Sequence, residues 1–338
     1  MKQMDNLKDR VTIYEVAKAA NVSLATVSRV INHHSNVKEE TKKLVNDTIA
    51  RLGYKPSALA QALATNRSTN IGVIIPSANY VYISNLLFGL TEVARTKGFV
   101  ISLFITSHNQ DEARKMIEKV ITSHVDGAII FDDELDENDV AKISSYKVPS
   151  IVINSHIVEE LVGCVYFGYE HLLKKIVASV LTRNENKKDI IFLQVEKGGR
   201  LLNRMEKACY EIHELLNKKC KTIINPDSYQ KTYDYFNKYF TSNRSKNYFI
   251  ASRDSIAIAI VNAARANKLR VPEDVEVLSI IGTKYAHMMS PMISSLYIDL
   301  VRVGKKAMSM LDDLINRKNA PKEFKFESVY QKRETTLE

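Results

Sequence analysis

Residues 11–32 read VTIYEVAKAANVSLATVSRVIN and decide how the amino-terminal part of the chain folds. Apolar residues recur there at i, i+3, i+4 and i+7, as one stripe on a first helix: Ile13, Val16, Ala17 and Ala20. Asn21 suits a tight turn, and Ser23 is placed to cap a second helix. The pattern therefore predicts two short helices joined by a turn.

The second expected helix has two different faces. One is an apolar stripe of Val27, Val30 and Ile31, and the other gathers Leu24, Ala25, Ser28, Arg29 and Asn32. Arg29 can donate two parallel hydrogen bonds to guanine, and Leu24 and Ala25 can contact thymine methyl groups. Hydroxyl groups suited to phosphate contacts belong to Thr12, Tyr14, Ser23, Thr26 and Ser28. The face favours insertion into the major groove of DNA, but spacing alone leaves open an ordinary helical hairpin.

A third amphipathic helix is expected from Glu39 to Leu52, with Gly53 as its C-cap. Three such helices can close a small core. Residues 54–67, YKPSALAQALATNR, follow and are rich in alanine. Their helix propensity is high, but the stretch is too short and too weakly amphipathic to be stable alone. We expect it to fold only against another surface.

The stretch from Val11 to Arg67 resembles the DNA-binding headpiece and hinge of the LacI/GalR family of bacterial transcription regulators. The likeness is carried by ATVSRV at 25–30 and LGYKPS at 52–57, and it continues through most of the chain. Within that family, VTIYEVA at 11–17 and VSLATVSRV at 22–30 are most similar to the catabolite control proteins of Gram-positive bacteria. The resemblance implies a homodimeric regulator, expected to be a repressor, on a pseudo-palindromic operator of double-stranded DNA.

The resemblance also implies a role for the hinge. Residues 57–64 would become a helix on operator binding and pair with the dimer mate in the minor groove, inserting Leu63 at a central base step. Ser57 and Gln61 stand where relatives carry Asn and Arg, so the hinge contacts of those relatives do not carry over. Taken alone, Leu63 suggests a core residue. The expected DNA contacts are Thr12, Ile13, Tyr14, Ser23, Leu24, Ala25, Thr26, Ser28, Arg29, Asn32, Ser57, Gln61 and Leu63.

Composition is compatible with a DNA partner. The chain has 338 residues, is 45% hydrophobic and carries a net charge of +9, so two or three domains of normal core size are expected. The first 67 residues hold 11 basic against 6 acidic side chains. That bias supports phosphate attraction, although a solvated basic surface would give the same count. No apolar run reaches 18 residues, and the start MKQMDNLKDR has no signal-like segment, so we expect a cytoplasmic protein without membrane contact.

From Asn70 onward, short apolar runs alternate with helical stretches. The runs lie at 71–76, 99–104, 127–131, 150–154, 190–193, 248–251 and 277–281. Continuous apolar strands separated by helices indicate parallel sheets covered on both faces. With the family resemblance, the expected fold class is α/β: a helix-turn-helix headpiece and hinge helix, then a periplasmic-binding-protein-like core of two Rossmann-like parallel-sheet subdomains. Ligands of such sheets bind at the carboxyl ends of strands.

The resemblance supplies the expected domain boundaries. The headpiece would take residues 1–56, the hinge helix and linker 57–69, and the effector-binding and dimerisation core 70–338. Within the core, the N-subdomain would take 70–166 and 295–323, and the C-subdomain 167–294 and 324–338.

The expected cleft departs from the family pattern. Relatives that bind sugars or purines satisfy ligand hydroxyls with carboxylates and amides. Here Gly168 stands where Asp is usual, Ile281 and Gly282 replace an Asp pair or Asp-Asn pair, and Arg253 replaces Asn. Asp254 and Arg204 remain. The expected cleft residues are Ser77, Tyr82, Gly168, Arg204, Arg253, Asp254 and Ile281.

Three hypotheses for control follow. Arg204 and Arg253 could hold an anionic small molecule, because guanidinium groups pair with carboxylate or phosphate. Alternatively, the cleft binds nothing and the core serves dimerisation and protein contacts. The third hypothesis is control by phosphorylated HPr, although Ser309 and Asp313 align with the basic phosphoserine-binding pair of the relatives. Lys305 and Lys306 lie about one turn away and could compensate.

An enzyme on the same core is the alternative from another class. The eight histidines are scattered, and the sequence has no glycine-rich phosphate loop and no Gly-x-Ser-x-Gly element. The acidic residues at 132–137 favour a solvated loop over a metal site. Cys164, Cys209 and Cys220 are an odd number without metal-ligand spacing, so reduced, buried thiols are favoured over a redox switch. We expect no catalysis, no cofactor and no metal.

Overall fold

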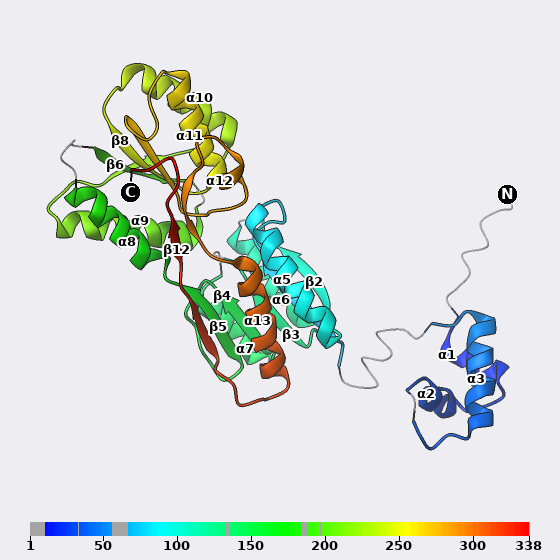
Figure 1. Ribbon diagram of the computed structural model, residues 1–338. Helices are drawn as coiled ribbons and strands as arrows, with labels where there is room; N and C mark the ends of the chain where they lie inside the picture. Colours follow the sequence, from blue (N-terminus) through cyan, green and yellow to red (C-terminus); the bar gives the residue numbers. More distant parts are fainter. Residues whose placement is uncertain are drawn as a thin grey trace. The chain divides into compact units, whose positions relative to one another are not determined.

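The computed structural model describes residues 11–32, 34–55, 67–107, 109–132, 135–183, 188–196 and 198–337. The chain divides into two compact units, residues 1–68 and 69–338 (Figure 1). Each unit is described by itself below. Among the described residues, no helix combines the length and the apolar character needed to cross a bilayer.

The first unit contains the three expected helices. They are α1 (Ile13–Ala19), α2 (Leu24–Ile31) and α3 (Glu39–Leu52). Their apolar faces meet in a core that buries Val16, Val27 and Val45 completely. Gly53 ends α3 in the left-handed conformation, with φ of 68°, which a residue without a side chain adopts at no steric cost. The bounds predicted for the third helix and its cap are confirmed.

The second unit contains two six-stranded sheets. The strand order of the first sheet is β11-β5-β4-β3-β1-β2, and all of its strand pairs are parallel. Its strands are β1 (Asn70–Ile75), β2 (Val100–Ile105), β3 (Gly127–Ile130), β4 (Ser150–Ile153), β5 (Val162–Phe167) and β11 (Glu323–Phe326). Its helices are α5 (Val81–Lys97), α6 (Gln110–Thr122), α7 (Glu137–Ser145) and α13 (Leu300–Ile315).

The second sheet has the order β12-β10-β9-β8-β6-β7, and only the pair of β10 with β12 is antiparallel. Its strands are β6 (Asp189–Gln194), β7 (Lys221–Ile224), β8 (Asn247–Ala251), β9 (Val275–Ser279), β10 (Ser294–Tyr297) and β12 (Val329–Gln331). Its helices are α8 (Tyr169–Thr182), α9 (Gly199–Leu215), α10 (Tyr229–Ser242), α11 (Asp254–Ala266) and α12 (Tyr285–Met288). The expected α/β class with two mostly parallel sheets is confirmed.

Two of the expected subdomain boundaries need correction. A boundary at residue 295 would cut β10, which pairs with β9 and β12 and so belongs to the second sheet. A boundary between 323 and 324 would cut β11, which pairs with β5 in the first sheet. Because ladder hydrogen bonds hold a strand in one sheet, the chain crosses between the halves after Tyr297 and after Phe326.

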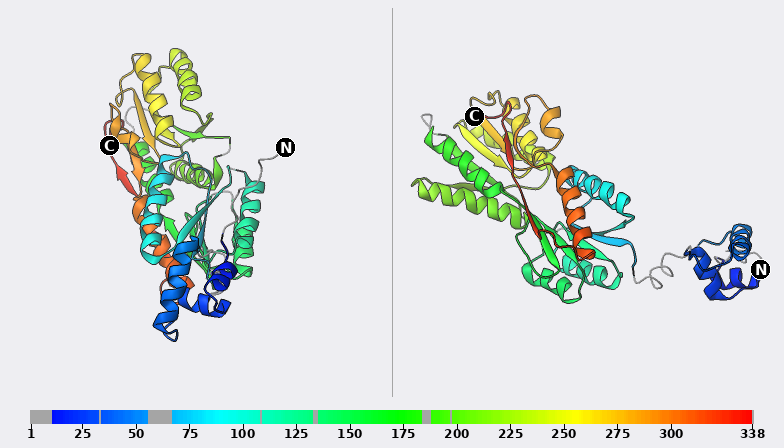
Figure 2. Two further views of the ribbon diagram at one scale, coloured as in Figure 1. Left: turned by 90° about the vertical axis from the view of Figure 1, so that its right-hand side faces the viewer. Right: turned by 60° about the horizontal axis from the view of Figure 1, so that its bottom comes forward.

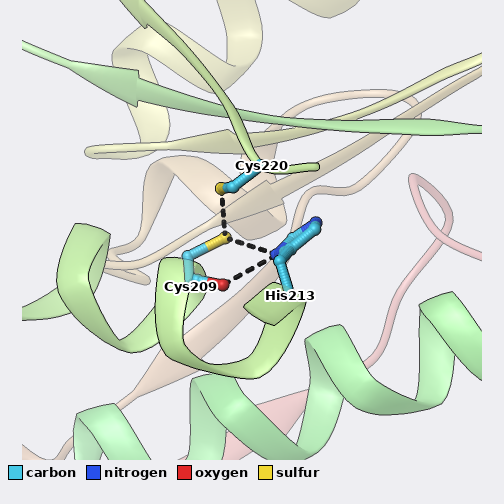
Figure 3. A group of neighbouring side chains, drawn as sticks. All are labelled: Cys209, His213 and Cys220. Atoms are coloured by element: carbon cyan, nitrogen blue, oxygen red, sulfur yellow. Dashed lines mark hydrogen bonds between the residues drawn. The ribbon is translucent and has the colours of Figure 1, made fainter. Parts of the chain in front are cut away.

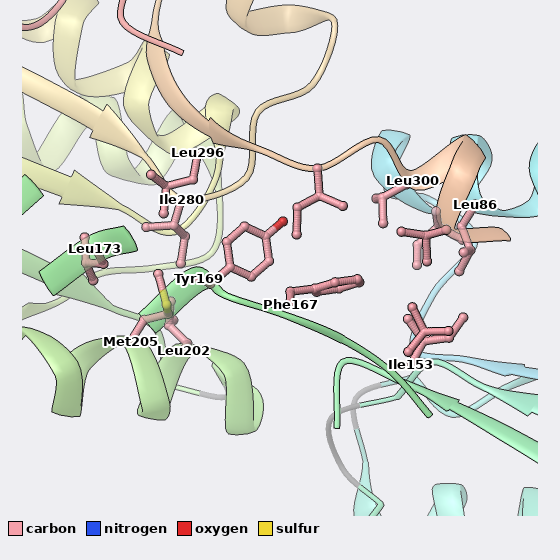
Figure 4. Close-up of a cluster of buried hydrophobic side chains, with 14 of the residues drawn as sticks. Leu86, Ile153, Phe167, Tyr169, Leu173, Leu202, Met205, Ile280, Leu296 and Leu300 are labelled. Atoms are coloured by element: carbon pink, nitrogen blue, oxygen red, sulfur yellow. The ribbon is translucent and has the colours of Figure 1, made fainter. Parts of the chain in front are cut away.

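One apolar cluster connects the two halves of the core (Figure 4). It runs from Leu86 and Ile153 on the side of the first sheet to Leu202 and Ile280 on the side of the second. Phe167 and Tyr169 lie between them, at the first crossing of the chain, with ring centroids 5.6 Å apart in an edge-on arrangement. The second unit is therefore held together by a shared core as well as by its three chain crossings.

Helices α5 and α13 lie side by side and approach very closely (Figures 1 and 2). The contact depends on two glycines. A β-carbon on Gly89 would overlap the carbonyl group of Val301, and one on Gly304 would lie 2.8 Å from the amide nitrogen of Leu90. Any larger residue would push the two backbones apart.

We expect Gly304→Ala to destabilise the core by about 1–3 kcal/mol, the usual cost of overpacking, although alanine favours a helix over glycine by about 1 kcal/mol. Urea unfolding of the full chain measures this difference. Gly168→Ala is the control, because the nearest atom to a β-carbon at Gly168 lies 3.6 Å away. A Gly304→Ala variant as stable as the parent chain would contradict the proposed backbone constraint.

Candidate nucleic-acid interface and cleft

The start of α1 is fixed by a reciprocal cap. The Thr12 hydroxyl accepts a hydrogen bond from the Glu15 amide at 3.4 Å, and the Thr12 amide donates to the Glu15 carboxylate at 2.6 Å. The Thr12 amide, and the Thr12 hydroxyl that donates to the same carboxylate at 2.9 Å, lower the pKa of Glu15. The two reciprocal cap bonds satisfy two backbone donors that the helix cannot satisfy itself. The Thr12 side chain, which is an expected phosphate contact, therefore also caps the start of α1.

The start of α2 is capped by Ser23, as predicted. Its hydroxyl accepts from the Thr26 amide at 3.1 Å, and the two hydroxyl oxygens lie 2.8 Å apart. Ser23 is exposed and Thr26 half-buried. The remaining amide groups of the first turn point out of the helix end, an arrangement that suits a phosphate group.

The outward face of α2 presents the side chains that were expected to read bases. Val27 and Val30 are buried against α1 and α3, whereas Leu24, Ala25 and Arg29 are exposed. Within residues 11–32 and 34–55, the guanidinium of Arg29 has no ion pair or hydrogen bond. A free guanidinium on an exposed helix face is available to an outside partner.

The other residues expected to contact DNA differ in how exposed their side chains are. Asn32 is exposed and donates to the hydroxyl of half-buried Ser28 at 3.4 Å. On α1, Tyr14 is exposed and Ile13 is half-buried against the headpiece core. Ser57, Gln61 and Leu63 lie outside the described residues.

Described residues of the second unit line three hollows at the carboxyl ends of the strands. Their volumes are about 90, 40 and 220 Å³. Pockets that enclose a drug-sized ligand measure roughly 300–1,000 Å³, so these hollows are small. Of the expected cleft residues, Tyr82, Arg253, Asp254 and Ile281 line at least one of them. Ser77, Gly168 and Arg204 line none of the three.

Arg204 is bound by the chain itself. Its Nε donates to the Glu170 carboxylate at 2.7 Å. Its terminal nitrogen donates to the backbone carbonyl and the side-chain oxygen of Asn154, at 3.1 and 3.2 Å. Glu170 belongs to α8 and Asn154 follows β4. Arg204 therefore bridges the two halves of the core.

Arg253 forms a second bridge. Its guanidinium pairs with Asp227 and lies 4.6 Å above the ring centroid of Tyr80, which follows β1 of the first sheet. The Tyr80 ring stacks in turn on Tyr82, with centroids 5.3 Å apart. Both arginines expected to hold an anionic ligand thus have carboxylate partners of their own.

Asp254 supports the local backbone. One of its oxygens accepts from the Thr283 amide at 2.6 Å and from the Thr283 hydroxyl at 2.7 Å. Burial raises the pKa of Asp254, and the hydrogen bonds from Thr283 oppose that rise. The second carboxylate oxygen is buried and has no hydrogen-bond partner among the described residues. Among the described residues that were expected to line the cleft, Asp254 therefore offers a buried acceptor oxygen that the chain itself does not use.

The three remaining cleft candidates offer little to a polar ligand. Gly168 precedes α8 as its N-cap residue. Ile281 is half-buried against the shared apolar core. The Ser77 hydroxyl accepts from the Asn79 amide at 3.2 Å.

Lys305 and Lys306 lie on α13 near the expected HPr-binding positions, and both contact side chains of other elements. Lys305 pairs with Glu92 at 2.8 Å, and the Lys306 ammonium lies 4.6 Å from the ring centroid of Phe324. Asp313 pairs with Lys318 at 2.9 Å, and Ser309 is exposed. Both lysines that could compensate for Ser309 and Asp313 therefore already contact other side chains of the described chain.

The sequence did not reveal the residues that complete the bridges, namely Asn154, Glu170, Asp227 and Tyr80. They come from four separate segments, and each looks like an ordinary loop or helix residue. Only the fold brings them to the two arginines. The acidic residue Asp136, part of the loop expected to be solvated, also lies 3.8 Å from Arg200 across the halves.

Comparisons with known proteins agree with this architecture. Residues 12–57 match the family described as bacterial regulatory proteins, lacI family, and residues 192–336 match a periplasmic binding protein-like domain. Catabolite control protein A of Priestia megaterium is 29% identical over 315 residues, which cover 91% of this chain and 93% of that protein. The protein of the same name from Staphylococcus aureus strain Mu50 is 28% identical over 313 residues, covering 90% and 93%. These relatives are transcription regulators and not enzymes, in line with the expectation that the chain has no catalytic role.

Solved structures share the fold at lower identity. The lac repressor dimer bound to operator and an anti-inducer superposes with a TM-score of 0.79 at 21% identity, covering 98% of this chain and 100% of that one. A lacI-family regulator from Silicibacter pomeroyi reaches 0.84 at 18% identity, covering 96% and 99%. The regulator CcpA of Lactococcus lactis reaches 0.64 at 18% identity, covering 79% and 98%.

Proposed function

We propose that this chain, a DNA-binding transcription regulator that joins a lacI-family domain to a periplasmic binding protein-like core, acts as a homodimeric repressor on a pseudo-palindromic operator. The observation that carries the proposal is the outward face of α2, where the unpaired guanidinium of Arg29 stands beside Leu24 and Ala25 within the matched residues 12–57. A repressor would act by occupying its operator and excluding the transcription machinery.

In this proposal each protomer reads one half-site. Arg29 donates to a guanine, and Leu24 and Ala25 contact thymine methyl groups in the major groove. Ile13, Ser28 and Asn32 complete the surface beside them. The capping hydroxyls of Thr12 and Ser23, together with Thr26 and Tyr14, would contact phosphates and so position the helix without specifying sequence. In the hinge, Leu63 would be the minor-groove wedge, with Ser57 and Gln61 beside it.

An exposed apolar surface supports the homodimer. Phe88 on α5 is 59% exposed, and Leu103 and Ile105, which share one face of the neighbouring edge strand β2, are 45% and 43% exposed. Exposed apolar side chains gathered on adjacent elements are typical of an interface. A two-fold dimer would place two α2 helices on two half-sites of a pseudo-palindrome.

For control, the geometry supports a regulator whose headpiece binds operator without a small effector in the core. Arg204 and Arg253 are neutralised by Glu170 and Asp227, and the hollows that Arg253 lines are small. An anionic small molecule is the second candidate, because such a ligand could displace Asp227 from Arg253 and Glu170 from Arg204. Phosphorylated HPr is the weakest candidate, since Lys305 and Lys306 are both engaged within the core.

Arg29→Ala tests base reading. We expect operator affinity to fall about 5- to 150-fold, the equivalent of roughly 1–3 kcal/mol, while affinity for unrelated DNA changes little. Gel shifts on selected operator and on scrambled DNA at fixed salt measure both. Arg51→Ala is the control, because it removes an equal charge from an exposed position in the last turn of α3. Equal losses on both DNAs for Arg29→Ala would remove Arg29 from the base-reading role.

Phe88→Asp tests the dimer. A charge in the apolar contact should convert the dimer to a monomer and abolish high-affinity operator binding, because only one half-site is then bound. Analytical ultracentrifugation gives the mass. Val158→Asp is the control: it places the same charge on an exposed apolar residue in a loop away from α5, and it should leave the dimer intact. A Phe88→Asp variant that remains dimeric would place the interface elsewhere.

The double variant Arg204→Ala with Arg253→Ala tests control. We expect the melting temperature of the parent chain to stay constant across phosphorylated and carboxylated metabolites, and the double variant to melt lower because Glu170 and Asp227 lose their partners. Arg302→Ala is the control, because its side chain is exposed on α13 and forms no ion pair with any described residue. A metabolite-dependent shift in the parent that the double variant lacks would establish the anionic effector instead.

A further inference from the structure

Two of the three cysteines meet a histidine in the second half of the core (Figure 3). Cys209 and His213 lie one turn apart on α9, and Cys220 immediately precedes β7. The two sulfur atoms are 3.6 Å apart. The Nδ1 of His213 lies 3.7 Å from the sulfur of Cys209 and donates to the carbonyl of the same residue at 2.7 Å.

The separation of the sulfurs suits bond formation. A disulfide has an S–S length of about 2.05 Å, so the two atoms must approach by about 1.5 Å. Cys220 lies outside helix and strand, and its neighbour Lys221 is the first residue paired with the sheet. The segment after α9 can therefore supply this movement without breaking ladder hydrogen bonds.

The two cysteines differ in exposure and in acidity. Cys220 is half-buried and Cys209 is fully buried. The Cys209 thiol donates to the sulfur of Cys220, and with the nearby His213 it lowers the pKa of Cys220 to about 5, against the opposing effect of burial. The same bond and burial raise the pKa of the Cys209 thiol. An accessible thiolate beside a protonated partner thiol is the usual arrangement of an oxidation-sensitive pair.

We propose that Cys209 and Cys220 form a reversible thiol-oxidation site, which closes to an intramolecular disulfide when hydrogen peroxide reaches Cys220. The sequence favoured reduced, buried thiols over a redox switch, because the three cysteines are an odd number without metal-ligand spacing. The fold changes that interpretation for two of them, since it places their sulfurs in contact.

The reaction has two steps. The Cys220 thiolate attacks one peroxide oxygen, the O–O bond breaks, and the departing hydroxide takes a proton from solvent, which leaves a sulfenic acid on Cys220. The sulfur of Cys209 then attacks that sulfenic sulfur, the S–O bond breaks, and the leaving hydroxide takes the Cys209 proton as water. Two thiols are oxidised to one disulfide while one peroxide is reduced to two waters. A small dithiol reverses the reaction by exchange.

The third cysteine provides an internal comparison. Cys164 on β5 is fully buried, and burial raises the pKa of its thiol. Its nearest potential partners are His156 and Glu323, not another cysteine. We therefore expect Cys220 to react with peroxide at least about tenfold faster than Cys164.

The same three side chains could also hold a metal ion, because their ligand atoms all lie within 4.8 Å of one another. Two observations favour oxidation. Structural zinc sites use four protein ligands, and the cluster supplies three. In addition, the Nδ1 of His213 is already committed to the Cys209 carbonyl.

The test uses the reduced full-length chain treated with a small excess of hydrogen peroxide. We expect free thiols, counted after denaturation, to fall from three to one, and a peptide map of the parent chain to join Cys209 to Cys220. Dithiothreitol should restore all three. This map needs no variant, so it remains informative if a substitution disturbs folding.

Three serine variants assign the roles. Cys209→Ser should stop at a sulfenic acid on Cys220 that dimedone traps, and Cys220→Ser should form neither product. Cys164→Ser is the control and should still form the disulfide. Oxidation of Cys164 as fast as Cys220, or stoichiometric zinc in the purified chain that both Cys209 and Cys220 are needed to retain, would overturn the proposal.

Discussion

The close approach of α5 and α13 is the constraint on which the core depends. Helix α13 follows strand β10 of the second sheet in sequence but packs on the first sheet. Its position therefore determines where the chain crosses between the halves. Gly89 and Gly304 permit that position because neither has a side chain between the backbones. The chain segment that leads from β10 to α13 also joins the shared apolar cluster, which contains residues of both elements.

The family resemblance predicts that Gly168 and Ile281 replace carboxylates and that Arg253 replaces an amide in the cleft. The structure shows how the two cleft arginines are satisfied instead. A partly buried cation needs a partner, and Asp227 with the ring of Tyr80 provides one. Arg204 is satisfied in the same manner by Glu170 and Asn154. The two arginines predicted to hold a ligand therefore form bridges between the halves of the core.

Local patterns allowed much of this structure to be predicted, and non-local pairing accounts for the rest. The headpiece helices follow from periodicity, and the seven apolar runs correspond to β1, β2, β3, β4, β6, β8 and β9 within two residues. Strands such as β11, with the sequence EFKF, carry no continuous apolar signal, because one edge and part of each face meet solvent. The subdomain boundary was misplaced at β10 because SSLY is short and polar. Likewise, Arg204 and Arg253 were singled out but their partners were not, and the contact of Cys209 with Cys220 depends on the turn between α9 and β7.

The three crossings between the sheets also affect the order in which parts of the chain can fold during synthesis. The headpiece helices are finished by residue 52, so this domain can close early as the chain leaves the ribosome. Each half of the core, in contrast, takes an edge strand from residues 323–331, β11 for one sheet and β12 for the other. During synthesis the headpiece can therefore fold well before either sheet is complete. The two sheets receive these edge strands almost together.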